Sequence, residues 1–300
     1  MPNSTDSPLR GIALKLISTI SFSLMAACAK AASSEVSGSI MVLVRAAVML
    51  AVVTPLVAYR KVPFFGKHHV LIHLRCSLGA LALHLYFYAI SQAPLGSVVV
   101  LGNSAPLFVP ILAIFFLGER PKLETIPILL AGFGGVILVL NPSFETFDSG
   151  RLAASSVGVI VAITIVCLKK LAGKEDPLTV VFCFSLWTFV TALLRPETWE
   201  GSLHDIGTVW HYLLLAGLFA VSGQFFLTSS LSFAPAVVIV LINHLSVALS
   251  FIFGLVFWDE VPEVAGLAGA GLIVGSSILT ALWARRLVGS SSSAPKSAET

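Results

Sequence analysis

Residues 93–121, APLGSVVVLGNSAPLFVPILAIFFLGERP, decide how the chain is organised because its second half repeats them. Adding 141 to the residue number carries Pro94 onto Pro235 and Glu119 onto Glu260 without a gap. In both copies a long apolar segment ends at a Glu, a Pro follows two residues later, and a second apolar, Gly-rich segment begins. The sequence therefore predicts that one half of the chain duplicates the other.

The composition indicates a protein that lies within a lipid bilayer. Of its 300 residues, 57% are hydrophobic and 11% are charged, and the mean hydropathy is +0.96. Soluble domains carry about 25% charged residues. The much lower charged fraction of this chain excludes a water-soluble fold. A spanning helix needs about 20 mostly apolar residues, so we predict an all-α polytopic membrane protein with ten transmembrane helices. They are expected at 11–33, 38–59, 71–92, 95–118, 123–141, 152–169, 178–195, 207–231, 235–258 and 262–284.

The basic residues indicate how the two halves are oriented. With the N-terminus in the cytoplasm, fourteen Lys and Arg residues, among them Lys15 and Arg75, fall on the cytoplasmic side. Three fall on the opposite side, and Arg45 is left inside a span. By the positive-inside rule this bias predicts that both termini are cytoplasmic. Because five spans is an odd number, the second half enters the membrane from the opposite face, which predicts two inverted five-helix repeats.

The duplication also sets the expected domain boundaries. We expect a disordered N-terminus at 1–9, a first five-helix repeat at 10–142, a second at 151–286 and a disordered tail at 287–300. The sequence has no GxxxxGK[ST] motif, no metal-ligand spacing and no catalytic constellation, so we predict no cofactor and no enzyme activity. Its basic residues are divided between loops rather than gathered on one face, which argues against nucleic acid as a partner.

The duplicated pattern resembles a known family. A long helix after an Ala-Pro turn, ending in Gly-Glu-Arg-Pro or Asp-Glu-Val-Pro and followed by a Gly-rich helix, is similar to the EamA-type members of the drug/metabolite transporter superfamily. The resemblance covers residues 10–286 and implies a transporter without an ATPase. It also implies a central cavity lined mainly by helices one, three, four, six, eight and nine. The second copy departs from the pattern, since Asp259 and Val261 replace Gly118 and Arg120.

Polar residues inside the spans are the candidate substrate site, because polar and ionisable groups within a membrane are costly and usually functional. Inverted-repeat carriers place substrate near the bilayer midplane, where the two halves meet. Packing between helices is the alternative interpretation of each group. The main candidates form three pairs, His84 and Tyr88 in the third span, Asn103 and Ser104 in the fourth, and Asn243 and His244 at the matching depth of the ninth.

Other polar residues have a less specific pattern. Gln224 in the eighth span is a further candidate for the substrate site. Arg45 could bind a substrate carboxylate or pair with backbone carbonyls of a neighbouring helix. Glu119 and Glu260 end their helices, and we expect each to tie its turn to neighbouring backbone donors, with a gating role as the alternative.

The candidate lining has Tyr, His, Asn and Ser but no acid, since no Asp or Glu lies near the middle of any predicted span. Such a lining suits a zwitterion with an apolar side chain better than a simple cation. We therefore expect a small-molecule carrier of the inner (plasma) membrane that exports amphipathic metabolites, above all aromatic or apolar amino acids, by alternating access. The outward direction of transport rests on the family resemblance. Efflux of cationic compounds and uptake of metabolites are the alternatives, and the sequence leaves the oligomeric state open.

Overall fold

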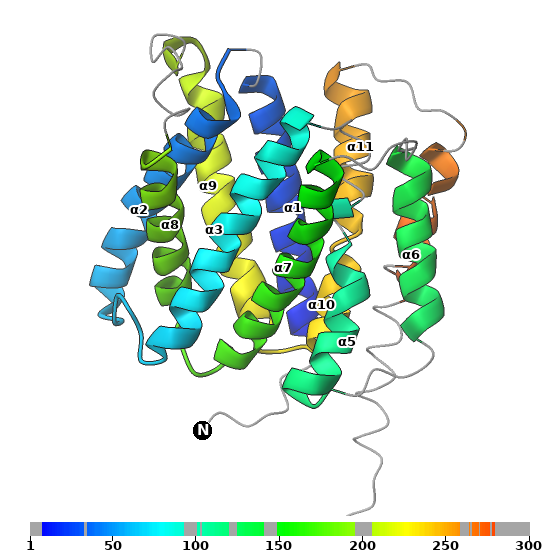
Figure 1. Cartoon of the computed structure of the whole chain (residues 1–300), viewed down its shortest axis with the longest axis horizontal. Helices are drawn as coiled ribbons and strands as arrows, with labels where there is room; N and C mark the ends of the chain where they lie inside the picture. Colours follow the sequence, from blue (N-terminus) through cyan, green and yellow to red (C-terminus); the bar gives the residue numbers. More distant parts are fainter. Residues whose placement is uncertain are drawn as a thin grey trace, which may run out of the picture.

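A computed structural model describes residues 8–32, 35–92, 101–102, 104–119, 125–140, 149–195 and 206–258, with shorter pieces at 264, 266–269, 271–276 and 278–279. Every regular element in these ranges is an α-helix (Figure 1). The first half contains α1 (Pro8–Ala32), α2 (Gly38–Arg60), α3 (His69–Gln92), α5 (Ala105–Leu117) and α6 (Thr125–Leu140). The second half contains α7 (Ser149–Leu171), α8 (Pro177–Leu193), α9 (Ile206–Ser230), α10 (Ala236–Ile242) and α11 (Leu245–Trp258).

The helices agree with the predicted spans except in three places. In the fourth span, predicted as one helix over 95–118, a turn at Ser104 directly precedes α5. The first helix begins at Pro8, so its start lies inside the segment 1–9 that we expected to be disordered. The ninth span, predicted as one helix over 235–258, is divided into α10 and α11. The predicted tail at 287–300 lies outside the described residues. By length and composition alone, four described helices can cross a membrane, namely Leu9–Ala32, Gly38–Arg60, Ser149–Leu171 and Gly207–Ser230.

The contacts between helices recur with the two halves exchanged. In the first half α1 packs along α9, and its counterpart α7 packs along α3 (Figure 1). Likewise, α5 contacts α7, while α10 and α11 contact α1. Two further contacts join equivalent spans of the two halves, because α2 contacts its counterpart α8, and α5 of the fourth span contacts α10 of the ninth. This exchange is what two inverted repeats produce when they pack against each other, and the predicted fold class is confirmed.

Small and hydroxyl residues allow α1 and α9 to approach closely. The Ser18 hydroxyl donates to the Gly223 carbonyl oxygen at 2.8 Å, and the Ser21 and Ser222 hydroxyls lie 2.9 Å apart. A Cβ atom at Gly223 would lie 2.8 Å from the ring of Phe22, so only glycine fits there. Close contacts between small residues are typical of helix pairs in membranes, where lipid supplies no hydrophobic drive between helices.

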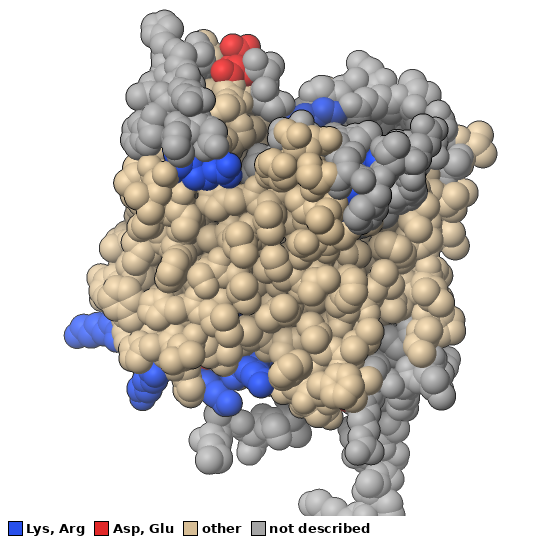
Figure 2. All heavy atoms as spheres, in the orientation of Figure 1, with Lys and Arg blue, Asp and Glu red and all other residues tan. Residues whose placement is uncertain are grey.

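The outer surface is apolar over most of its height. On the face drawn in Figure 2, Lys and Arg of the described residues appear only along the two edges of a broad uncharged band. Large exposed side chains within the described helices include Phe115, Phe116 and Val256. A surface with this pattern matches the hydrocarbon layer of a bilayer, whose thickness is about 30 Å.

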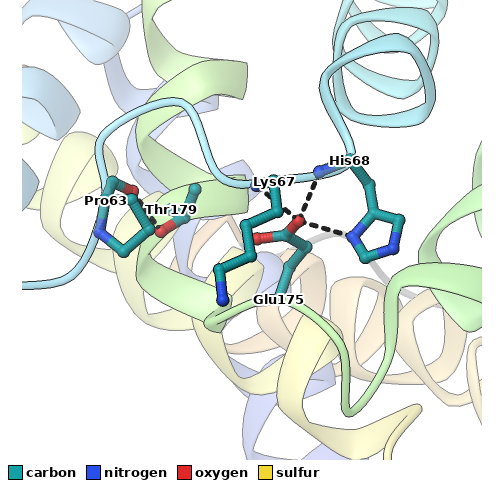
Figure 3. A network of polar contacts seen from close by, with 5 residues as sticks. All are labelled: Pro63, Lys67, His68, Glu175 and Thr179. Carbon is teal, nitrogen blue, oxygen red and sulfur yellow. Dashed lines mark hydrogen bonds and ion pairs between the residues drawn. The ribbon is translucent and has the colours of Figure 1, made fainter.

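One loop of the first repeat is tied to the second repeat (Figure 3). Glu175, in the turn after α7, accepts hydrogen bonds from the backbone N–H groups of Lys67 at 2.7 Å and His68 at 2.6 Å, and its Oε1 lies 2.7 Å from His68 Nδ1. Nearby, the Thr179 hydroxyl donates to the Pro63 carbonyl oxygen at 2.7 Å. Burial raises the pKa of the Glu175 carboxyl, but the hydrogen bonds together outweigh burial and hold that pKa below its ordinary value.

We expect Gly217→Ala to destabilise the protein through overpacking between α9 and α2. A Cβ atom at Gly217 would lie 2.5 Å from Val48 Cβ, whose branched side chain has little freedom to move. Overpacking costs about 1–3 kcal/mol, which exceeds the gain in helix propensity of up to about 1 kcal/mol. The melting temperature of the purified protein should therefore fall. Gly207→Ala on the same helix is the control, because no atom of the described residues lies within 4 Å of its added Cβ.

We expect Glu175→Gln to lower the melting temperature at pH 7 by weakening the contact between the two repeats. The pKa of Glu175 is depressed in the folded protein, so its contribution to stability is present above the ordinary carboxyl pKa and is lost as the pH falls through the folded value. The difference in melting temperature between wild type and variant should thus be full at pH 7 and shrink below about pH 4. A difference that does not change with pH would contradict this assignment.

Candidate functional site

The junction between α10 and α11 interrupts the ninth span at Asn243 and His244. The Asn243 N–H donates to the Val240 carbonyl oxygen at 3.0 Å and the His244 N–H to Leu241 at 3.4 Å, three residues back instead of the four of an α-helix. The Ser246 hydroxyl donates to the Asn243 carbonyl oxygen at 2.7 Å, which satisfies a backbone acceptor at the break. Interrupted helices of this kind mark binding sites in carriers built from inverted repeats.

The fourth span has a turn at the corresponding position of the first repeat. Ser104 lies in a turn directly before α5, and its hydroxyl donates to the Leu101 carbonyl oxygen at 2.6 Å. Gly158 of α7 packs directly on Ser104, with no room for a side chain. Asn103, the other candidate in this span, lies outside the described residues. The two repeats thus both depart from regular helix at equivalent positions, and both departures lie against the opposite repeat.

A lysine reaches the break from α1. Lys15 is only 2% exposed, and its ammonium donates to Asn243 Oδ1 at 2.9 Å. It lies seven residues after Pro8, about 10 Å along the helix. The charge bias placed Lys15 on the cytoplasmic side of the membrane, but its side chain is enclosed by the surrounding helices rather than exposed at that surface.

A cavity of about 100 Å³ adjoins Lys15 and Asn243. Five helices line it, α1 and α5 from the first repeat and α7, α9 and α10 from the second. Within the span count they are helices one, four, six, eight and nine, which are five of the six that the family resemblance implies. The walls are mainly apolar, and the lining includes Lys15, Pro106, Ile165, Leu227, Ile239 and Asn243.

A second cation is buried between α3, α8 and α9. Arg75 is 4% exposed, its Nη2 donates to Gln224 Oε1 at 2.9 Å, and its guanidinium carbon lies 4.4 Å from the centre of the Phe184 ring. Arg75 was also placed on the cytoplasmic side, and its side chain is likewise enclosed within the protein. No Asp or Glu of the described residues pairs with either Arg75 or Lys15. Within the described residues, Lys15 and Arg75 are thus two buried basic groups that have amide rather than carboxylate partners.

Comparison with known proteins decides the family. The sequence pattern of the EamA-like transporter family matches residues 9–141 and 148–282, one match for each half. The chain belongs to this EamA-like transporter family. Family members and relatives are transporters, so this protein is a multi-pass membrane transporter of small molecules.

Two curated relatives and one solved structure extend this EamA assignment. The chain is 27% identical to the pseudopaline exporter of Pseudomonas aeruginosa over 274 residues, covering 89% of this chain and 94% of that protein. It is 30% identical to solute carrier family 35 member G1 of Mus musculus over 255 residues, covering 78% of this chain and 68% of that protein. A crystal structure with 19% sequence identity superimposes with a TM-score of 0.80, covering 92% of this chain and 98% of that one, and shows a shared fold.

The break separates two candidate residues of this EamA transporter. Asn243 faces α1 and the cavity, whereas His244 faces away from them. The His244 side chain is 1% exposed, and neither ring nitrogen has a hydrogen-bond partner among the described residues. A Cβ atom at Gly132 of α6 would lie 2.5 Å from His244 Nδ1 and 2.9 Å from the Ser276 hydroxyl. The His244 side chain therefore packs against Gly132 of α6, on the side where Ser276 of the tenth span also approaches.

The remaining candidates do not line the cavity. His84 Nδ1 lies 3.3 Å from Arg195 Nη1 at the end of α8, and the Tyr88 hydroxyl donates to the Ser149 hydroxyl at 3.4 Å at the start of α7. Both therefore lie toward the last turns of α3. Arg45 is partly buried in α2, and its Nε has no partner within the described part of the chain.

Glu119 has the structural role that its position at a helix end predicted. Its two carboxylate oxygens each lie 3.1 Å from the backbone nitrogen of Ala236, whose N–H they accept at the first turn of α10. Close by, the Lys169 ammonium donates to the carbonyl oxygens of Leu231 at 2.8 Å and Ala234 at 2.7 Å. Together these side chains satisfy backbone groups at the corner between α9 and α10. The counterpart Glu260 lies outside the described residues.

We expect Glu119→Ala to destabilise the transporter, because the first turn of α10 would lose its carboxylate acceptor. Loss of a capping acceptor costs about 0.5–2 kcal/mol. Glu119→Gln keeps one acceptor oxygen and should lie between wild type and Ala in melting temperature. Equal melting temperatures for all three proteins would show that the cap contributes nothing.

Proposed function

We propose that this transporter exports small amphipathic metabolites, with aromatic and apolar amino acids as the preferred class, by alternating access. In this proposal the cargo occupies the cavity between the repeats and moves outward across the inner membrane, with both termini in the cytoplasm. Asn103, Ser104 and Asn243 would contact it at the two helix breaks. His84 and Tyr88 would line the outward path, and we retain His244, Gln224 and Arg45 as further candidates.

The cavity at the two breaks is the observation that supports this proposal most directly. Its walls combine apolar side chains with the ammonium of Lys15 and the amide of Asn243. Small-molecule sites pair apolar walls with a few polar groups that orient the ligand. At about 100 Å³ the cavity is smaller than the roughly 300–1,000 Å³ of such sites. Binding of a whole amino acid therefore requires the repeats to move apart, as alternating access demands.

Efflux of cationic compounds is the main alternative, and the charges in the interior oppose it. Lys15 and Arg75 are buried, whereas no Asp or Glu lies within any of the described helices from α1 to α11. A cation entering this region would meet like charges at low dielectric, where repulsion is strong. The outward direction is supported by the similarity to an exporter, the pseudopaline exporter.

Counterflow in proteoliposomes tests the proposal. Vesicles that contain the purified protein and a high internal concentration of unlabelled phenylalanine should accumulate external radiolabelled phenylalanine, because a carrier exchanges cargo across the membrane. Unlabelled leucine and tryptophan should compete, and protein-free vesicles are the control. Accumulation of labelled tetraphenylphosphonium without any exchange of amino acids would instead support efflux of cationic compounds.

A further inference from the structure

The environment of Lys15 is incomplete for a buried cation. Its side chain is 2% exposed, and its one hydrogen bond in the described part of the chain goes to the Asn243 side-chain oxygen. An ammonium carries three donors, and removing it from water costs several kcal/mol unless a counter-charge compensates it. An amide oxygen supplies only part of a charge. Among the described residues, the site therefore lacks an anionic group.

The cavity provides the space in which such a group can reach Lys15. Lys15 and Asn243 both belong to its lining, and the other lining residues are apolar. A volume of about 100 Å³ holds a carboxylate and little more. Arg75 gives independent support, because it is a second buried cation with an amide as partner, Gln224, and no acid among the described residues.

We propose that Lys15 binds a carboxylate group of the cargo, which replaces Asn243 as the partner of the ammonium. This inference rests on the proposed function, in that the cargo passes through this cavity. It narrows the cargo to compounds with a carboxylate, such as amino acids and organic acids, and excludes amines and amides of the same shape. The carboxylate adds the attraction between two opposite charges, which is strong at low dielectric and which the neutral amide of Asn243 does not supply, so the cargo carboxylate outcompetes the amide.

The exchange of partners also connects binding to movement. Asn243 lies at the junction between α10 and α11, so its bond to Lys15 ties α1 of the first repeat to the break in the second. Cargo that takes over Lys15 releases this tie. A ligand shifts a conformational equilibrium only as far as it binds one state better than another, and a state in which Asn243 has left Lys15 binds the carboxylate better.

Ligand pairs that differ only in charge test this site. Binding to the purified protein would be measured by isothermal calorimetry for three pairs. Phenylalanine is compared with phenylalaninamide, 3-phenylpropionate with phenethylamine, and succinate with succinamide. The proposal predicts that each acid binds more tightly than its amide or amine. It is overturned if no acid in the panel binds more tightly than its uncharged or cationic partner.

Two variants at the site and one control connect this preference to Lys15. Lys15→Met keeps the length of the side chain without the charge, and Asn243→Asp supplies a permanent carboxylate partner within the protein. Both should weaken binding of the acids by about tenfold or more. Lys170→Met, which removes a cation near the Phe116 ring at the end of α7, should leave binding unchanged. Acids that bind Lys15→Met and Asn243→Asp as tightly as wild type would overturn the proposal.

The outcome separates this inference from the proposed function. If phenylalanine shows no counterflow while succinate or 3-phenylpropionate binds through Lys15, the cargo class is organic acids and the amino-acid proposal fails alone. If phenylalanine is exchanged equally by wild type and Lys15→Met, amino-acid transport stands and the assignment of Lys15 is wrong. Monodisperse elution and an unchanged helical circular dichroism spectrum establish that each variant is folded.

Discussion

Backbone N–H and C=O groups inside hydrocarbon must find their partners within the protein. The break at Asn243 is therefore possible only where protein surrounds it, and it lies between α1 and the second repeat. The turn at Ser104 lies in the same way against Gly158 of α7. Both irregular segments are thus confined to the contact between the repeats. The same constraint that places them there gathers the polar side chains of the interior at this contact.

Composition and the 141-residue offset were sufficient to predict the helical class, the duplication and its inversion, because these depend on length and parity rather than on packing. The division of the ninth span was not predictable in the same way. Residues 236–258 contain no Pro, and their one Gly, Gly254, lies well beyond the break, so local propensity favours a continuous helix. Only the polar pair at 243–244 hinted at the break, and the contacts that stabilise it come from α1, which is distant in sequence.

The buried cations were missed for a related reason. A lysine or arginine within two turns of a helix end usually extends its long stem to the membrane surface, and the charge count treated Lys15 and Arg75 in this way. Whether such a side chain reaches the membrane surface depends on the helices around it, and here neighbouring helices cover both Lys15 and Arg75. The useful signal in the sequence was a single basic residue several positions inside an apolar run with no acid near it. Of the sequence-named candidates that the structure describes, Asn243 alone contacts both Lys15 and the cavity.

The bond from Glu119 to the first turn of α10 limits how the two halves can separate. It joins the end of α5 in one repeat to the start of α10 in the other, at a corner that Lys169 also closes. A motion that parts these two ends leaves a carboxylate and a backbone donor without each other. A motion that keeps them together lets α5 and α10 turn relative to each other only about that corner, as about a hinge, and the cavity between them then opens farthest from it.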